Sequence, residues 1–371
     1  MKEKGQSRDV RLDILRILAC FLIVLSHVSA EGLDAFPIDT LSWKYSHVLN
    51  TVGHTGTVLF LFISGSLLLS EEYQFTPKRF YARNFLRLLI SYCAWVVIYH
   101  LVGFLGRGQY SWPFVKDMII NIIKGEAGYH FWYVPMLLGI YLILPMLRAI
   151  CRAEKNVVNY FVALFFVVQV LFSTIKVFEF PYKYLLVSLM DRIPFTLVNH
   201  YVGYFVMGYW LTGVARKFTP SLNRWRGGVL FVTGIVGSLL GEIYLTVQNG
   251  YKSIFFNSLF SVTMCVSAVG LFIMNRGISV KDSPDFGRRI ARISQLTFGV
   301  YMLHPLILGE AMKISLTDRI PIGLRLPLLT VLVFGISMLV TWLLSWIPGV
   351  REWVLYQAHT PKHKQKEGKG N

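Results

Sequence analysis

Apolar stretches long enough to cross a bilayer recur along the whole of this 371-residue chain. A transmembrane helix needs about 20 mainly apolar residues. Such stretches lie at about residues 12–31, 49–70, 85–105, 131–148, 157–175, 196–214, 227–247, 255–274, 293–312 and 325–346. Because 54% of the residues are hydrophobic and 15% are charged, one soluble core cannot bury this apolar surface. We therefore predict an all-α fold, a polytopic integral membrane helical bundle with about ten transmembrane helices.

The distribution of Lys and Arg predicts how these helices are oriented, because short cytoplasmic loops are enriched in both residues. With the N-terminus in the cytoplasm, most of the 37 Lys and Arg residues fall in segments on the inner side. We therefore expect both termini in the cytoplasm, in a multi-pass protein of the cell membrane. The formal net charge of +17 then reflects topology and attraction to anionic lipid, so no nucleic-acid partner is expected.

The chain is expected to form one integral domain, since no internal repeat is visible at a period of about 20 to 50 residues. We predict a cytoplasmic N-terminus at residues 1–11, a single transmembrane domain at 12–346 and a basic cytoplasmic tail at 347–371. The tail is rich in Lys and Gly, and we expect it to be largely disordered.

An arginine and a histidine lie inside the first apolar stretch. Arg16 and His27 are eleven positions apart, which on an α-helix puts them about 20° apart in direction and about 16 Å apart along the axis. Ionisable side chains inside a membrane usually serve a function. Arg16 is placed to bind an anion that enters from the cytoplasm, and His27 to act as a general base near the midplane. Alternatively, Arg16 and the adjacent Asp13 anchor the helix at the inner interface, and His27 bonds to another helix.

Four phrases occur in the order and spacing of a known family. In chain order they are Asp13-x-x-Arg16 followed by ten residues and His27, Phe60-Leu-Phe-Ile-Ser64-Gly65, His130-Phe-Trp132-Tyr133, and Gly299-Val-Tyr301-Met-Leu-His304. Together they resemble membrane-bound acyltransferase family 3, over about residues 10–346. The resemblance implies transfer of an acyl group, most often acetyl, from cytosolic acyl-CoA to a hydroxyl of a surface polysaccharide or a lipid-linked precursor. It also implies a bacterial source, and hence the inner membrane.

The resemblance implies a catalytic role for His27, supported by Arg16 and Asp13, and a contact between Arg16 and the donor. Relatives often carry two arginines before the third helix, but Asn84 stands where the first is expected. Three further arginines are kept as candidates for binding the donor phosphates, and they are Arg79, Arg83 and Arg87. The alternative for these loop arginines is the ordinary enrichment of inner segments in positive charge. Val58 replaces the proline of the second helix.

Polar and aromatic side chains on the proposed outer half are candidates for binding the acceptor. Sugars are bound by hydrogen bonds and aromatic stacking. The candidates are Trp132, Tyr133, Tyr301, His304, His54 and Glu242, together with Asn199 and His200. Hydrogen bonding between helices is the alternative role for each polar member of this set.

No metal site is expected, because none of the predicted spans carries a pair of histidines four residues apart and the chain has no HExxH phrase. Its four cysteines are widely spaced and form no CxxC pair, so disulfides and cysteine-bound metals are not expected either. The leading alternative function is a membrane exporter or flippase of a surface glycan, which would need a wide polar passage and no acyl-CoA site. A purely structural or lipid-binding membrane protein would leave the buried ionisable residues without a role.

Overall fold

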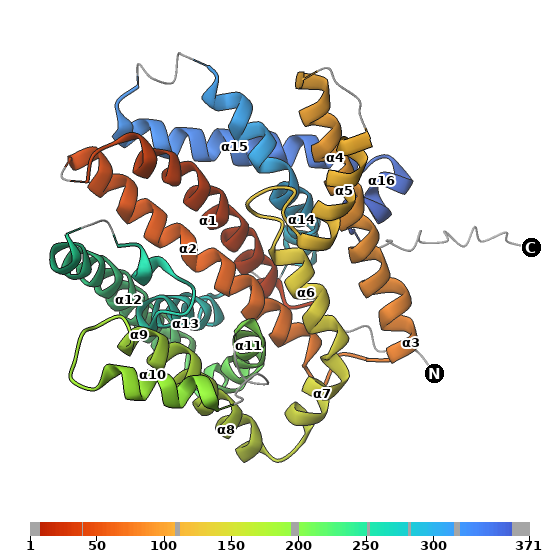
Figure 1. Cartoon of the computed structure of the whole chain (residues 1–371). Coiled ribbons are helices and arrows are strands. Elements are labelled where there is room, and N and C mark those ends of the chain that lie inside the picture. The colour runs from red at the N-terminus through yellow and green to blue at the C-terminus, as the bar shows by residue number, and fades with distance from the viewer. Residues whose placement is uncertain are drawn as a thin grey trace, which may run out of the picture.

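The computed structural model describes residues 8–38, 40–107, 112–193, 200–250, 253–280, 283–314 and 320–357, and these ranges contain helices and no strands (Figure 1). The helices are α1 (Val10–Ala35), α2 (Leu41–Leu68), α3 (Pro77–Phe80), η1 (Tyr81–Phe85), α4 (Leu86–Arg107), α5 (Trp112–Lys124), α6 (Tyr133–Leu142), α7 (Leu144–Arg152), α8 (Lys155–Phe165), η2 (Phe166–Leu171), α9 (Phe172–Ile175), α10 (Lys183–Arg192), α11 (Tyr201–Ala215), α12 (Pro220–Asn249), η3 (Phe255–Asn257), α13 (Val262–Arg276), α14 (Pro284–Met312), α15 (Ile322–Leu344) and α16 (Pro348–Trp353).

Within the described residues, 7 helices are long and apolar enough to cross a membrane, or up to 8 if the bent pair α6 and α7 forms one span. The all-helical, polytopic architecture is thus supported, whereas a count of ten spans is not. The two predicted spans that do not qualify correspond to α11, which has 15 residues, and to α14. The apolar part of α14 contains Gln295, His304 and Glu310, which lower its hydropathy. The orientation of the termini stays a prediction.

The first two long helices form a closely packed antiparallel pair at the centre of the fold (Figure 1). A Cβ atom on Gly53 of α2 would lie 2.5 Å from the backbone nitrogen of Ser26 in α1. Only a residue without a side chain permits such an approach. The contact brings the polar face of α1 around His27 against the first half of α2.

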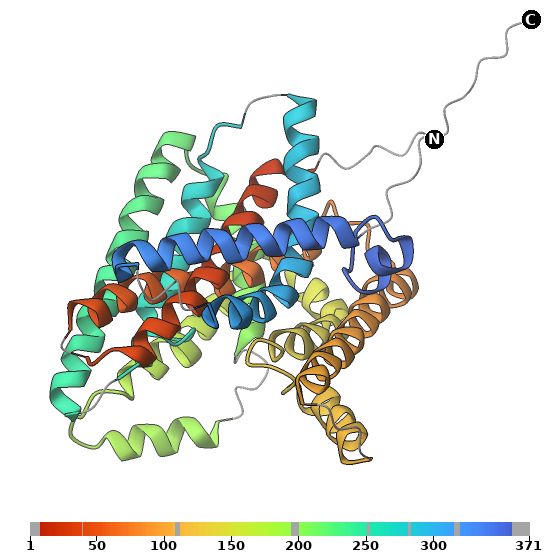
Figure 2. The same cartoon turned by 90° about the horizontal axis from the view of Figure 1, so that it is seen from above.

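The other long helices surround this pair. α11 crosses α2 closely, since a Cβ atom on Gly65 would meet the backbone oxygen of Phe205 at 1.7 Å. α12 and α13 form a second pair, while α14 and α15 pack against α1 (Figure 2). Segments distant in the sequence therefore gather around α1 and α2.

The bend between α6 and α7 is 60°. Pro145 follows the break at the start of α7, and proline lacks the backbone N–H that would continue the helix. On α7, Arg148 is 2% exposed. Its guanidinium donates to the backbone oxygens of Leu68, Ser70 and Tyr73. It thereby satisfies the Leu68 carbonyl at the C-terminus of α2, which has no partner within the helix, and two carbonyls of the loop that follows.

The first part of the predicted disordered tail is structured. α16 is followed by a turn in which Leu355 is fully buried and Gln357 is 4% exposed. Three side chains of α4 bind backbone oxygens of this region, and they are Arg87, Ser91 and Trp95. These bonds, together with the burial of Leu355, hold this short segment against α4. Residues 358–371 lie outside the described residues.

Candidate active site

A large cavity of about 1340 Å³ runs beside α1. The α1 side chains that line it extend from Leu12 to Asp34, a distance of about 33 Å along the helix axis. The hydrocarbon core of a bilayer is about 30 Å thick. The cavity is therefore long enough to connect the two sides of a membrane, with α1 forming one wall throughout.

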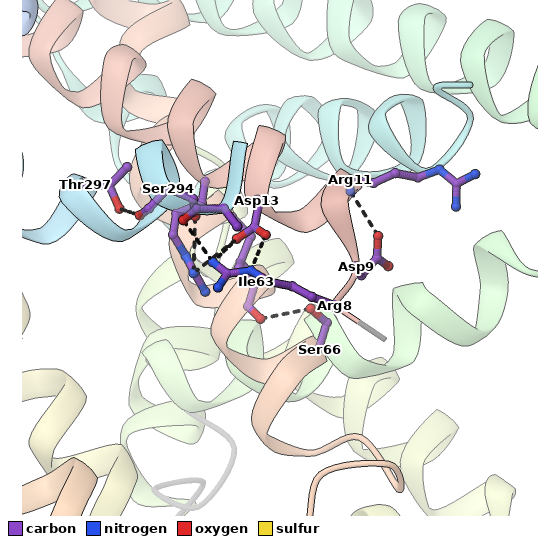
Figure 3. A network of polar contacts seen from close by, with 10 residues as sticks. Arg8, Asp9, Arg11, Asp13, Ile63, Ser66, Ser294 and Thr297 are labelled. Atoms are coloured by element: carbon purple, nitrogen blue, oxygen red, sulfur yellow. Dashed lines mark hydrogen bonds and ion pairs between the residues drawn. The ribbon is translucent and has the colours of Figure 1, made fainter. Parts of the chain in front are cut away.

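A network of charges lies at the end of the cavity near the start of α1 (Figure 3). Nε and Nη2 of Arg8 donate to the two carboxylate oxygens of Asp13 at 2.5 and 2.8 Å. Arg16 is farther from this carboxylate, at 3.8 Å, and its Nη1 donates to Oγ of Ser294 at 3.5 Å. Because Arg8 already occupies both oxygens of Asp13, most of the donor capacity of Arg16 is left for a ligand in the cavity.

More charged and phenolic groups line the same end. Arg276 pairs with Asp9 just before α1, and Arg216 lies 3.8 Å from Glu72. Tyr73, in the loop that follows α2, also lines the cavity. Burial raises the pKa of Tyr73 above its ordinary value, although the positive charges of nearby arginines act in the opposite direction. Its phenol is therefore a neutral hydrogen-bond donor at neutral pH.

His27 lies near the middle of the cavity in a cluster of rings. Its imidazole stacks on that of His304, with ring centroids 5.2 Å apart and planes at 25°. The Tyr129 ring lies 4.6 Å from it on a tilted plane. His27 lines the cavity and is partly buried, whereas His304 is fully buried behind it. The cluster thus holds one face of the His27 ring and leaves another toward the cavity.

A second layer of rings supports this cluster. His130 contacts His304 with centroids 5.7 Å apart, and the Tyr301 hydroxyl donates to the backbone oxygen of His130. The hydroxyl oxygen of Tyr99, on α4, lies 3.4 Å from Nε2 of His130. The same hydroxyl donates to the backbone oxygen of Met302 at 2.8 Å. Segments before α6, within α4 and within α14 are in this way joined around His27.

Amide side chains line the opposite end of the cavity. Nδ2 of Asn50 donates to the backbone oxygen of Ser26 at 2.8 Å, and Nδ2 of Asn257 lies 3.3 Å from Oδ1 of Asn50. The Asn257 backbone N–H donates to the buried carboxylate of Glu242 at 3.0 Å. His54 lies one turn after Asn50 and lines the cavity as well. Apart from Asp34 near the end of α1, the polar groups described at this end are neutral and suited to hydroxyl-bearing ligands.

One family of known proteins matches the chain. It is described as an acyltransferase domain, and it matches residues 9–346, nearly the whole chain. The chain belongs to this family of acyltransferases. The resemblance seen in the sequence phrases is thereby confirmed. Searches of curated proteins and of solved structures gave no match.

Seven candidate residues of this acyltransferase lie around one cavity. Its lining includes Arg16, Asp13, His27, His54, Trp132, Tyr133 and Tyr301. Trp132 is 37% exposed and lies 5.2 Å from the ring of Tyr201, another lining residue. Two aromatic faces therefore stand together in the cavity wall.

The three arginines near the start of α4 are not among the residues that line the cavity of this acyltransferase. Arg79 and Arg83 are exposed, and Arg87 donates to the backbone oxygens of Glu352 and Gln357. Their role in donor binding stays a prediction. The arginines that line the cavity near the start of α1 are instead Arg8, Arg16, Arg216 and Arg276.

Three of the described acceptor candidates do not line the cavity, and they are Glu242, His200 and His304. Glu242 is 1% exposed and holds the backbone of Asn257 rather than lining the cavity. His200 is exposed, and its backbone N–H donates to Oε1 of Gln169. Asn199 lies outside the described residues. In the described part of the chain, no group of three or more His, Cys, Asp or Glu side chains is arranged to hold a metal ion.

Sequence reasoning missed several residues of the site, including Arg8, Arg276, Asn50, Asn257 and Gln357. None of them stands in a sequence motif that points to a function, so no local pattern identifies it. His130 is different, because it stands in a phrase typical of the family and still received no role.

Proposed function

We propose that the protein is an integral-membrane O-acyltransferase that takes an acetyl group from cytosolic acetyl-CoA. The acceptor is a hydroxyl of a surface polysaccharide or of its lipid-linked precursor. The single observation that carries the proposal is one cavity, long enough to cross a membrane, with Arg16 toward one end and His27 near the middle. Membership of an acyltransferase family supports the same reaction class.

The donor is proposed to enter from the end that contains Arg16. Coenzyme A carries several phosphate charges at one end and the thioester at the other. A guanidinium forms strong, directed bonds with phosphate oxygens. The long bond from Arg16 to Ser294 and its loose pair with Asp13 leave such donors available. The slim pantetheine arm then extends along α1 toward His27.

The acceptor is proposed to approach His27 from the opposite end. Asn50, Asn257 and His54 line that end, and the neighbouring rings of Trp132 and Tyr201 provide aromatic faces. Sugars combine hydroxyl groups with apolar ring faces, so both kinds of contact suit them.

In the proposed reaction, a neutral nitrogen of His27 accepts the proton of the acceptor hydroxyl as its oxygen attacks the thioester carbonyl. The tetrahedral intermediate collapses, the carbon–sulfur bond breaks, and the proton passes from His27 to the departing thiolate. The products are an acetyl ester and free CoA. General base catalysis of this kind contributes about 10²- to 10⁴-fold in rate. A covalent acetyl-histidine would instead place the acetyl group on the same nitrogen before the hydroxyl attacks.

The test is to purify the protein in lipid and to measure acetyl-CoA binding and thioester loss for the wild type and for His27→Ala. The expected result is that both bind and that the variant turns over at least about 100-fold more slowly. His100→Ala is a matched control, since this partly buried histidine of α4 does not line the cavity. Trapping of acetylated protein during turnover would identify the covalent route.

Absence of binding to acetyl-CoA and to longer acyl-CoA donors would overturn the proposal. A glycan exporter or flippase would then be the next candidate to test. That alternative is not favoured, because the family match is to an acyltransferase domain.

A further inference from the structure

The turn at residues 354–357 forms part of the cavity wall at its charged end. It follows α16, which packs beside α4 in both views of the fold (Figures 1 and 2). Tyr356 and Gln357 are among the lining residues. The turn lies about 80 residues after Arg276, the nearest positively charged lining residue in the sequence, so proximity in sequence does not account for its position.

α4 holds the backbone of this turn at several points. Nε1 of Trp95 donates to the backbone oxygen of Val354 at 2.9 Å, and the Ser91 hydroxyl donates to the same oxygen. The Arg87 guanidinium donates to the backbone oxygen of Gln357. Together these bonds clamp both ends of the turn.

The turn itself is conformationally constrained. Tyr356 has φ of 51°, in the left-handed region, which non-glycine residues adopt at a cost unless their surroundings enforce it. Its ring packs against Phe298 with centroids 5.6 Å apart. Phe298 lies one turn of α14 after Ser294, the residue to which Arg16 donates. The constrained Tyr356 and the guanidinium of Arg16 therefore contact neighbouring turns of the same helix.

The side-chain amide nitrogen of Gln357 is buried. The residue is 4% exposed, and its Nε2 has no hydrogen-bond partner among the described residues. A buried amide N–H normally has one, because burial without a partner is costly. The terminal torsion of glutamine is broad, so a small rotation directs this N–H into the cavity that the residue lines.

We propose that Gln357 contacts the CoA donor directly and that Arg87 is a positioning residue that acts through the Gln357 backbone. The ligand group is an oxygen acceptor of the CoA moiety, either an amide carbonyl of the pantetheine arm or a phosphate oxygen. The inference rests on the proposed acyl-CoA donor. It gives Arg87 a role different from direct phosphate binding, since the guanidinium is directed at backbone oxygens.

The first experiment measures CoA binding to the full chain in lipid for the wild type, Gln357→Ala and Gln357→Glu. The alanine variant is expected to bind CoA about 10-fold more weakly, because it lacks one charge-assisted or amide hydrogen bond. The glutamate variant should bind more weakly still, because a carboxylate repels phosphate. Gln248→Ala, at an exposed position of α12, is the matched control.

Pantetheine, which lacks the nucleotide phosphates, distinguishes the two kinds of oxygen. An equal loss of affinity for pantetheine and CoA in Gln357→Ala assigns the contact to an amide carbonyl. A loss of affinity for CoA, with unchanged affinity for pantetheine, assigns the contact to a phosphate oxygen. A wild type that binds CoA, with a Gln357→Ala variant whose affinity is unchanged for both probes, overturns this inference and leaves the proposed function intact.

The positioning role of Arg87 has its own readout. Arg87→Ala should weaken CoA binding about as much as Gln357→Ala, and the double variant should be no weaker than either alone, since both act through one contact. Arg226→Ala is the control, an exposed arginine that contacts Phe218 and does not line the cavity. If the losses of CoA affinity add up in the double variant, Arg87 binds the donor independently of Gln357.

A labelling experiment covers the case in which these variants unfold. With the four native cysteines replaced by serine, Gln357→Cys is treated with a water-soluble thiol reagent. Labelling that CoA slows at least several-fold supports the contact. Labelling at the same rate with and without saturating CoA contradicts it.

Discussion

The imidazole rings of His27 and His304 stack with their centroids 5.2 Å apart, although the two residues are far apart in the sequence and on different helices. His304 is fully buried, and its Nδ1 lies 3.2 Å from the backbone oxygen of Val300. The stack therefore joins the ring of a proposed general base to a buried ring of α14. Sequence reasoning gave His304 a role in acceptor binding, but His304 does not line the cavity.

We expect His304→Ala to lower kcat by about 10- to 100-fold with little change in KM, because the His27 ring would lose its support and its orientation. His304→Phe keeps a stacking surface and should recover part of the rate. Steady-state kinetics with acetyl-CoA and an acceptor give both constants. A rise in acceptor KM with unchanged kcat would instead support direct acceptor binding by His304.

Arg16→Ala should raise the KM for the acyl donor by about 10- to 100-fold, the loss typical of one hydrogen bond to a charged group. Arg16→Lys should recover part of this affinity, since it keeps the charge but loses the planar fork of donors. Arg152→Ala, at an exposed position of α7, serves as a control for a general loss of positive charge. Equal effects of Arg16→Ala and Arg152→Ala on KM would refute a specific donor contact.

Gly53→Ala should lower the free energy of unfolding by about 1–3 kcal/mol, the usual cost of forcing extra atoms into a packed contact. The added Cβ would lie 2.5 Å from the backbone of Ser26 and would push α1 away from α2. Gly335→Ala, on α15, is a matched control with no atom within 4 Å of the added group. Denaturation of both variants in the same detergent measures the difference, and equal stability would contradict the close contact.

Glu242→Ala should destabilise the segment around η3 by about 1–3 kcal/mol, because the buried N–H of Asn257 loses its acceptor. Glu242→Gln keeps an oxygen at this position and should cost less. Hydrogen exchange at residues 253–261 reports the local effect. Glu310→Ala removes a carboxylate from an exposed pair with Lys313 and should change little. If Glu242→Ala leaves exchange unchanged but impairs acceptor use, a direct role in binding is the better explanation.

Much of the helical architecture could be predicted from hydropathy. The predicted stretches at 12–31, 49–70 and 325–346 correspond to α1, α2 and α15, because a span must bury a long apolar run whatever its neighbours are. The predicted number of ten spans is not reached among the described residues. The stretches in α11 and α14 are short or interrupted by polar residues, and such helices cannot be classified from composition alone.

Within the candidate site, the shared face of Arg16 and His27 could be predicted because both lie on one helix, where the spacing alone sets their direction. The assignment of Arg87 to the donor phosphates rested on spacing too. Its side chain is directed instead at backbone oxygens of a turn more than 260 residues away. Spacing gives the face of a helix but does not reveal which partner packs against it.

The sequence alone determined that this chain is a helical membrane protein of an acyltransferase family, with an arginine and a histidine on one face of its first long helix. The helical, membrane-spanning character and the shared face follow from composition, periodicity and local spacing, whereas the family was indicated by the resemblance of four short phrases to known relatives. Only the tertiary structure decided that the Asp13 carboxylate binds Arg8 and that His304 stacks on His27. It also decided that the turn at residues 354–357 forms part of the cavity wall. Each of these contacts joins separate segments, and the packing of whole helices, rather than any short phrase, sets their positions.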